Sequence, residues 1–138
     1  GSFSGEQLAL GYRKSVYTDS DYVITKLILK LQPGDPAAIR AAMDDKMARR
    51  KAKQPLEYPS AGSTFKRPVG YFAGALIEEC GLKGFTVGGA QVSEKHAGFV
   101  INKGGATTAD ILNVIHAVQE RVYAQKGVRL ETEVKYIG

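Results

Sequence analysis

The stretch Tyr58–Pro68, which reads YPSAGSTFKRP, interrupts the regular secondary structure of this chain. Proline and glycine, here Pro59 and Gly62, disfavour both a regular helix and a central strand. Small residues allow a ligand to approach the backbone closely, and Lys66 and Arg67 add positive charge suited to phosphate or carboxylate groups. Taken alone, this composition weakly indicates a shaped loop that binds an anion.

The segment before this loop predicts one strand and one long helix. Residues 22–31 (YVITKLILKL) are β-branched and apolar, which indicates a well-buried strand. Asp35 as the N-cap and Pro36 at the first helical position predict a helix that runs to about Lys53. One face of this helix carries apolar side chains at helical spacing, which predicts a stripe packed on the core: Ile39, Met43 and Met47.

The segment after the loop predicts a short helix and an antiparallel pair of strands. Residues 71–80 suit a helix with Phe72 and Leu76 facing the core and Cys80 as a further candidate, and Gly81 is a good residue to follow its end. Residues 84–92 and 98–102 read as strands on either side of a short turn at 94–95. A turn of that length favours antiparallel pairing.

A second long helix and a last strand complete the pattern. Thr107 or Thr108 can cap the helix, Asp110 is favourable in its first turn, and Gly127 ends it. Its buried face is expected to carry the apolar residues Ile111, Ile115, Val118 and Val122. Residues 129–137 alternate as a strand with Glu131, Glu133 and Lys135 on one face. We therefore predict an α+β fold, in which helices pack on one face of a small, largely antiparallel sheet.

Composition excludes several classes of protein. The 138 residues fit one domain, and 43% hydrophobic with 24% charged residues is a globular balance. No apolar run approaches the roughly 20 residues needed to cross a bilayer. One cysteine and two histidines give neither an intrachain disulfide nor a metal-ligand cluster, and they suggest a reducing compartment. The net charge of +5 fits a solvated surface, an anionic small molecule or a nucleic acid.

Several motifs in order resemble the UDP-N-acetylenolpyruvoylglucosamine reductase (MurB) family, in its shorter type. They are GYRKS at 11–15, RKAKQP at 50–55, YPSAGSTFKRP at 58–68, VGGAQVSEKHAGFVIN at 87–102 and GVRLETEVKYIG at 127–138. Lys14 departs from the acidic residue usual in the first of these. Family members carry FAD on a domain that precedes this region. The resemblance therefore implies a lead-in and linker end at 1–10, a substrate-binding domain at 11–138, and a flavin domain lost by trimming or cleavage.

The resemblance also implies the reaction. The family uses NADPH and FAD to reduce the enolpyruvyl ether of a UDP-N-acetylglucosamine to UDP-N-acetylmuramate, for peptidoglycan synthesis. The flavin carries the redox chemistry, while this domain would orient and polarise the substrate. We expect the isolated chain to hold no FAD or NADPH, to be inactive alone, and to come from the bacterial cytoplasm.

Three residues match the catalytic positions of the family. Ser63 matches the proton donor, and its alternative role is to bond the loop backbone. Glu133 matches the catalytic glutamate, although Glu131 lies on the same predicted face and spacing alone cannot separate the two. Arg13 matches an arginine whose guanidinium can hold a carboxylate with two parallel hydrogen bonds.

Further polar residues match positions that contact the nucleotide sugar: Tyr12, Lys53, Lys66, Arg67, His96 and Lys135. A structural role is about equally plausible for His96, and Asn102 is expected to hold a turn rather than to touch substrate. A nonenzymatic UDP-sugar-binding module is the alternative function. A nucleic-acid-binding domain is disfavoured, because the basic residues lack interleaved aromatic side chains and any recognised motif. No membrane and no metal are implied.

Overall fold

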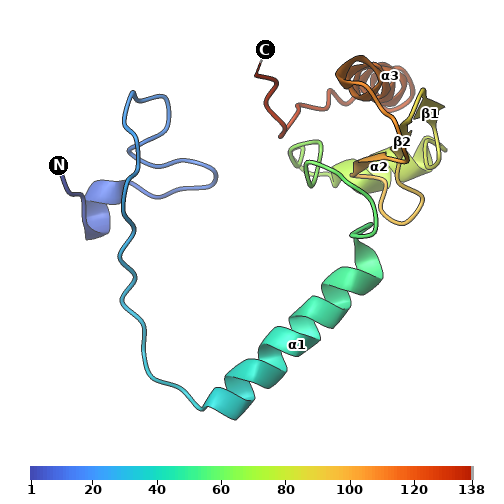
Figure 1. Cartoon of the computed structure of the whole chain (residues 1–138). Coiled ribbons are helices and arrows are strands. Elements are labelled where there is room, and N and C mark those ends of the chain that lie inside the picture. The colour runs from blue at the N-terminus through green and yellow to red at the C-terminus, as the bar shows by residue number, and fades with distance from the viewer. Residues whose placement is uncertain (138) are drawn as a thin grey trace. The chain divides into compact units, whose positions relative to one another are not determined.

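The computed structural model describes residues 1–137 and divides the chain into two compact units, Gly1–Asp35 and Pro36–Gly138. Each unit is described by itself, since the placement of one relative to the other is not determined (Figure 1). This division falls at Asp35, whereas the sequence suggested a boundary after residue 10, which stays a prediction.

The first unit is a set of turns around three aromatic rings. A 3-10 helix, η1 (Gly5–Leu8), follows a capping box at Ser4. The rings of Phe3, Tyr17 and Tyr22 lie with centroids 5.5 to 6.2 Å apart. The prediction of a buried strand at 22–31 is wrong, because this segment has no regular structure and its large apolar side chains are exposed. A strand needs a neighbour to accept its backbone hydrogen bonds, and no strand of the described chain pairs with it.

The first long helix, α1 (Pro36–Lys53), has the predicted bounds but none of the predicted burial. Ile39, Met43 and Met47 are each about half exposed, so the proposed core stripe is wrong. Ion pairs one turn apart, Arg40 with Asp44 and Arg49 with Asp45, run along the helix surface. An apolar face shows that a helix could pack against another element, but it does not provide that element. No described residue of this helix is buried.

The sheet of the second unit has three short antiparallel strands in the order β1 (Thr86–Val87), β2 (Ala90–Val92) and β3 (Val100–Asn102). Pairing of the two predicted strands is therefore confirmed. The segment 84–92 is a hairpin rather than one strand, because Gly88 turns the chain at φ +53. A side chain at Gly89 would collide with the backbone of Gly104 and Ala106, so the hairpin packs closely on the next loop.

The long helix packs on all three strands of this sheet, and the short helix packs against the long one (Figure 1). The short helix α2 (Ala73–Glu79) buries Leu76 and Ile77, and Gly81 follows its end at φ +68. The prediction for Phe72 is wrong: it is 62% exposed and lies under the guanidinium of Arg67 instead of in the core.

The long helix α3 (Thr108–Lys126) begins with a capping box and ends at Gly127. The Thr107 hydroxyl accepts a hydrogen bond from the Asp110 amide, and the Asp110 carboxylate accepts one from the Thr107 amide. The predicted buried face is confirmed at Ile115, Val118 and Val122, while Ile111 is half-buried and Val114 takes its place in the core. The α+β prediction is confirmed.

The C-terminal segment is held to the body without forming a strand. The predicted strand at 129–137 is reduced to one bridge, Phe65 with Thr132, and Tyr136 is 68% exposed. Gln119 of α3 donates a hydrogen bond to the Leu130 carbonyl at 2.7 Å. Hydrogen bonds to the loop at 64–66 and to the long helix that contains Gln119 hold this segment, and within residues 1–137 no strand pairs with it.

Candidate functional site

Three of the segments that carry predicted site residues meet at Thr64, which is 3% exposed. The Thr64 carbonyl accepts a hydrogen bond from the Glu133 amide, and the Thr64 amide donates to the Gly98 carbonyl, both at 2.8 Å. The Thr64 hydroxyl oxygen accepts a third bond from the Val100 amide at 3.0 Å. One buried residue thus joins the loop of Ser63, the segment of Glu133 and the end of the loop that carries His96.

Sequence analysis did not single out Thr64. The only signal was its position between the matched Ser63 and the apolar Phe65, within a polar loop. A threonine in such a loop satisfies its own backbone as easily as it bonds a distant segment. The tertiary structure shows that the amide, the carbonyl and the hydroxyl of Thr64 each bond a segment distant in the chain.

Ser63 lies at the surface beside this junction, after Gly62 at φ +85. Its hydroxyl donates a hydrogen bond to the Phe65 carbonyl at 3.3 Å. That is the loop-bonding role considered as an alternative to catalysis. The bond is long and at an exposed site, so the hydroxyl can turn to another acceptor at small cost.

The two glutamates of the C-terminal segment have different surroundings. Glu131 is exposed and forms a 3.0 Å ion pair with Lys66. Glu133 is half-buried, and its Oε2 atom is shielded from solvent. The half-buried carboxyl is the better placed of the two to act on a bound ligand, because solvent screens it less.

A mainly apolar cavity of about 170 Å³ adjoins the junction. It is enclosed by the loop at 59–61, by β3, by the first turns of α3 and by the segment 134–136. Lys135 and Tyr136 are among its lining residues, although both are largely exposed. Asn102 also lines it and holds the following turn, since its Oδ1 accepts hydrogen bonds from the Gly104 and Ala106 amides.

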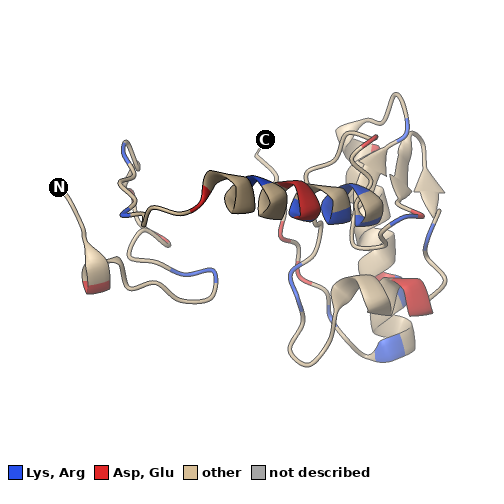
Figure 2. Cartoon of the chain, turned by 90° about the horizontal axis from the view of Figure 1, so that it is seen from below, with Lys and Arg blue, Asp and Glu red and all other residues tan. Residues whose placement is uncertain are grey.

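The other basic residues of the predicted site lie at the surface. Lys66 pairs with Glu131, and Arg67 donates to the Tyr71 carbonyl and covers the Phe72 ring at 4.0 Å. Lys53 is the exposed last residue of α1. Figure 2 shows basic positions gathered near that end of α1, whereas acidic and basic positions are mixed over the rest of the second unit.

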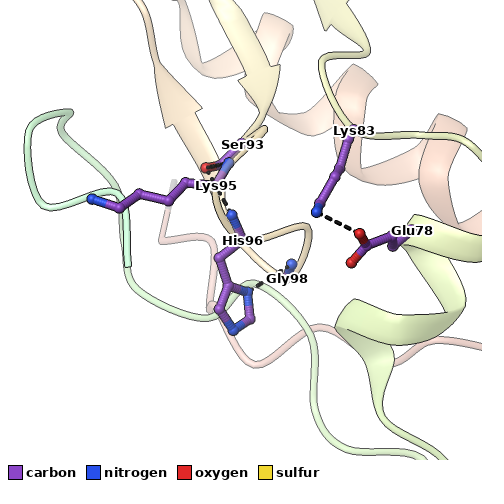
Figure 3. A network of polar contacts seen from close by, with 6 residues as sticks. All are labelled: Glu78, Lys83, Ser93, Lys95, His96 and Gly98. Atoms are coloured by element: carbon purple, nitrogen blue, oxygen red, sulfur yellow. Dashed lines mark hydrogen bonds and ion pairs between the residues drawn. The ribbon is translucent and has the colours of Figure 1, made fainter. Parts of the chain in front are cut away.

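His96 is half-buried at the end of a tight turn, as Figure 3 shows. The buried Ser93 hydroxyl accepts hydrogen bonds from the amides of Lys95 and His96. The Gly98 amide donates to His96 Nδ1 at 3.1 Å, and the Phe99 ring meets the imidazole edge to face. Sequence analysis missed Ser93, which is 1% exposed and holds the turn.

Tyr12 and Arg13 belong to the first unit and form the tip of a tight turn closed by Gly11 and Lys14. Arg13 has a left-handed backbone, at φ +54, which costs strain for a residue other than glycine. Its guanidinium lies 5.1 Å from the centre of the Tyr12 ring. Backbone hydrogen bonds of Thr64 join the segments that carry Ser63, Glu133 and the His96 turn. Tyr12 and Arg13 are described only within their own unit.

The glycine-rich hairpin at Gly88 and Gly89 does not fit a dinucleotide phosphate. A side chain at Gly88 would meet the Asp110 carboxylate at 2.5 Å, so this space holds a negative group that would repel phosphate. The same carboxylate accepts hydrogen bonds from Thr107 and from the Gly89 amide, which lower the pKa of Asp110. Among residues 1–137, no group of three or more His, Cys, Asp or Glu side chains could hold a metal ion.

Comparison with known proteins identifies the family. The model of the UDP-N-acetylenolpyruvoylglucosamine reductase C-terminal domain matches residues 54–137. The chain belongs to this family. It is 58% identical over 133 residues to UDP-N-acetylenolpyruvoylglucosamine reductase from Clostridium perfringens, covering 96% of this chain and 44% of that protein. The reductase from Pediococcus pentosaceus is 57% identical over 137 residues, covering 99% of this chain and 46% of that protein.

A solved structure agrees with this assignment. The crystal structure of the reductase (MurB) from Thermus caldophilus matches with a TM-score of 0.76 and 37% identity, covering 94% of this chain and 46% of that one. The chain therefore spans just under half the length of the relatives that it matches. No helix in the described part of the chain is both long and apolar enough to cross a membrane.

Proposed function

We propose that this chain supplies the substrate-binding and proton-donating part of a UDP-N-acetylenolpyruvoylglucosamine reductase. The observation that carries the proposal is the junction at Thr64, which holds the Ser63 loop and the Glu133 segment to each other. Ser63 and Glu133 are the proton donor and the catalytic glutamate that the family resemblance requires at one reaction centre. A binding module without chemistry would have no need to hold both.

The proposed substrate is the enolpyruvyl ether of UDP-N-acetylglucosamine. In the family, flavin reduced by NADPH supplies the hydride, and we place that cofactor on a part of the whole protein outside the residues described here. Reduction leaves negative charge on the carbon next to the substrate carboxylate and on the carboxylate itself. The residues of this chain must therefore stabilise that charge and then deliver a proton.

Each residue has a separate task in this scheme. Ser63 breaks its long bond to the Phe65 carbonyl and gives its hydroxyl proton to the carbon. Glu133, shielded from solvent at Oε2, acts on the substrate carboxylate through a proton that lies between the two groups, because two like charges would repel. Arg13 pairs with the same carboxylate through its guanidinium. Tyr12, Lys53, Lys66, Arg67, His96 and Lys135 hold the nucleotide sugar.

The proposed setting is the bacterial cytoplasm, where nucleotide-activated precursors are made. A single cysteine is compatible with that reducing compartment.

The test separates the two half-reactions in a full-length reductase that contains this sequence. Ser63→Ala should slow reoxidation of the reduced flavin by substrate about 10²- to 10⁴-fold, the usual effect of losing a general acid. Reduction of the flavin by NADPH should stay nearly unchanged. Stopped-flow absorbance of the flavin measures both steps.

Glu133 and Glu131 form a matched pair in the same assay. Glu133→Gln should slow the substrate half-reaction, whereas Glu131→Gln removes an exposed surface ion pair and should change it less than about threefold. Equal loss in both half-reactions for Ser63→Ala, or equal effects of the two glutamine variants, would contradict the assigned roles.

A further inference from the structure

The apolar cavity of about 170 Å³ touches the segments of the proposed reaction centre without including its acids. Thr64 and Val134 line the cavity, whereas their neighbours Ser63 and Glu133 are not among the described residues that enclose it. The cavity is therefore a separate space that shares one wall with the proposed reaction centre.

Small side chains and a fixed backbone keep this space open. One wall carries Pro59, Ser60 and Ala61, whose side chains are too short to fill it. The Pro59 carbonyl accepts a hydrogen bond from the Asn102 amide at 2.9 Å, and Ser60 forms a bridge with Ile101. These contacts hold the wall to β3, so it cannot move inward freely to close the space.

The facing wall is one side of the helix α3. Its lining residues are three or four positions apart, which places them on one helix face: Thr108, Ile111, Leu112 and Ile115. Ile115 is buried, and Ile111 and Leu112 are half-buried. This wall offers a ligand aliphatic carbon on a regular element.

The polar side chains of the walls leave little for a polar ligand to bind. The Thr64 hydroxyl oxygen accepts a hydrogen bond from the Val100 amide, and Asn102 Oδ1 accepts two from the turn that follows it. Among the described residues that enclose the cavity, Lys135 is the one charged residue. Burial of an ammonium group without an acidic partner costs far more than burial of a neutral ring. The walls therefore favour a neutral ligand over a cation.

We propose that this cavity is a binding site for a small neutral aromatic molecule, which contacts the segment of Glu133 through Val134. Apolar cavities of about 150 Å³ bind benzene, so a volume of about 170 Å³ suits one ring with a short substituent. Tyr136 is also a lining residue, and aromatic pairs gain energy beyond their buried area. The site does not depend on the identity of the substrate in the proposed function.

The test uses benzyl alcohol as the probe and the ¹⁵N-labelled chain of 138 residues. Two-dimensional NMR should show saturable shifts of the Ile111, Ile115 and Val134 amides, with a dissociation constant on the order of 1 mM. The shifts should extend to the amide of Glu133, which bonds the Thr64 carbonyl. Benzylammonium, the same ring with a positive charge, should bind at least about tenfold more weakly.

Two neighbouring tryptophan variants locate the site. Leu112→Trp fills the cavity and should abolish the saturable shifts. Asn113 is exposed and is not among the lining residues, so Asn113→Trp is the matched control and should bind benzyl alcohol like the unaltered chain. Leu112→Ala makes the cavity larger and should bind indole more tightly than the unaltered chain does. The alanine variant decides the question if Leu112→Trp does not fold.

The outcomes are distinct. Saturable shifts that disappear in Leu112→Trp and persist in Asn113→Trp, together with preference for the uncharged probe, support the proposal. No saturation at millimolar concentration, equal affinity for the two probes, or unchanged affinity for indole in Leu112→Ala overturns it. Each result leaves the proposed function unaffected, because Ser63 and Glu133 are not among the described lining residues.

Discussion

At the scale of single residues, Thr64 determines where the proposed reaction centre forms. It is buried, and it bonds three segments that are far apart in sequence, through Glu133, Gly98 and Val100. Two of these bonds use its backbone and would survive any substitution that keeps the local conformation. The third depends on the hydroxyl alone, which makes the contribution of the side chain separable.

Thr64→Val keeps the shape of the side chain and removes the acceptor of the Val100 amide. Because a buried amide would lose its partner, we expect the free energy of unfolding to fall by about 1–3 kcal/mol. Urea unfolding followed by circular dichroism measures the change. Thr64→Ser, which keeps the hydroxyl, is the matched control and should lose less stability. Equal losses in the two variants would show that the methyl group, not the hydrogen bond, matters here.

At the scale of elements, helix ends and turns follow local sequence, whereas burial does not. Pro36 and Lys53 bound α1 as predicted, and Thr107 and Gly127 flank α3 as predicted. The capping box of α3 also reaches the neighbouring hairpin, since Asp110 accepts hydrogen bonds from Thr107 and from Gly89. One carboxylate therefore links the start of the helix to the turn between β1 and β2.

This link makes stability depend on pH in a predictable direction. The hydrogen bonds to its carboxylate lower the pKa of Asp110 in the folded chain. A lowered pKa contributes stability that is present above the unfolded pKa, about 3.9 for aspartate, and is lost as the pH falls through the folded pKa. The difference in melting temperature between the unaltered chain and Asp110→Asn should therefore be largest near neutral pH and shrink below about pH 4. A constant difference from pH 7 to pH 2.5 in calorimetry would rule this out.

At the scale of the whole molecule, the core is confined to one part of the chain. Among the residues that the structure describes, every buried one lies between Pro55 and Leu130. The family model matches nearly the same range, residues 54–137. Hydrophobic burial is the main favourable contribution to folding, so this range should carry the stability of the second unit.

Removing residues 1–53 should leave that core intact. We expect a chain of residues 54–138 to unfold in one cooperative transition, with a midpoint within a few degrees of that of the 138-residue chain. Differential scanning calorimetry of the two chains makes the comparison. As a control, Val118→Ala within α3 should lower the midpoint in both chains, because it leaves a cavity at a fully buried position. Loss of the transition in the shorter chain would show that the first 53 residues contribute to the core.

The sequence by itself determined the caps, the glycine-marked helix ends, the antiparallel pair and the family, because each depends on neighbouring residues or on a recognisable order of motifs. It could not determine that residues 22–31 and the apolar face of α1 are exposed, since periodicity shows which face could be buried but not whether anything covers it. Spacing could not separate Glu133 from Glu131, which share a face, and only the family motif favoured Glu133. Only the tertiary structure placed one glutamate in solvent beside Lys66 and shielded the other next to Thr64, because burial and hydrogen-bond partners come from segments distant in the chain.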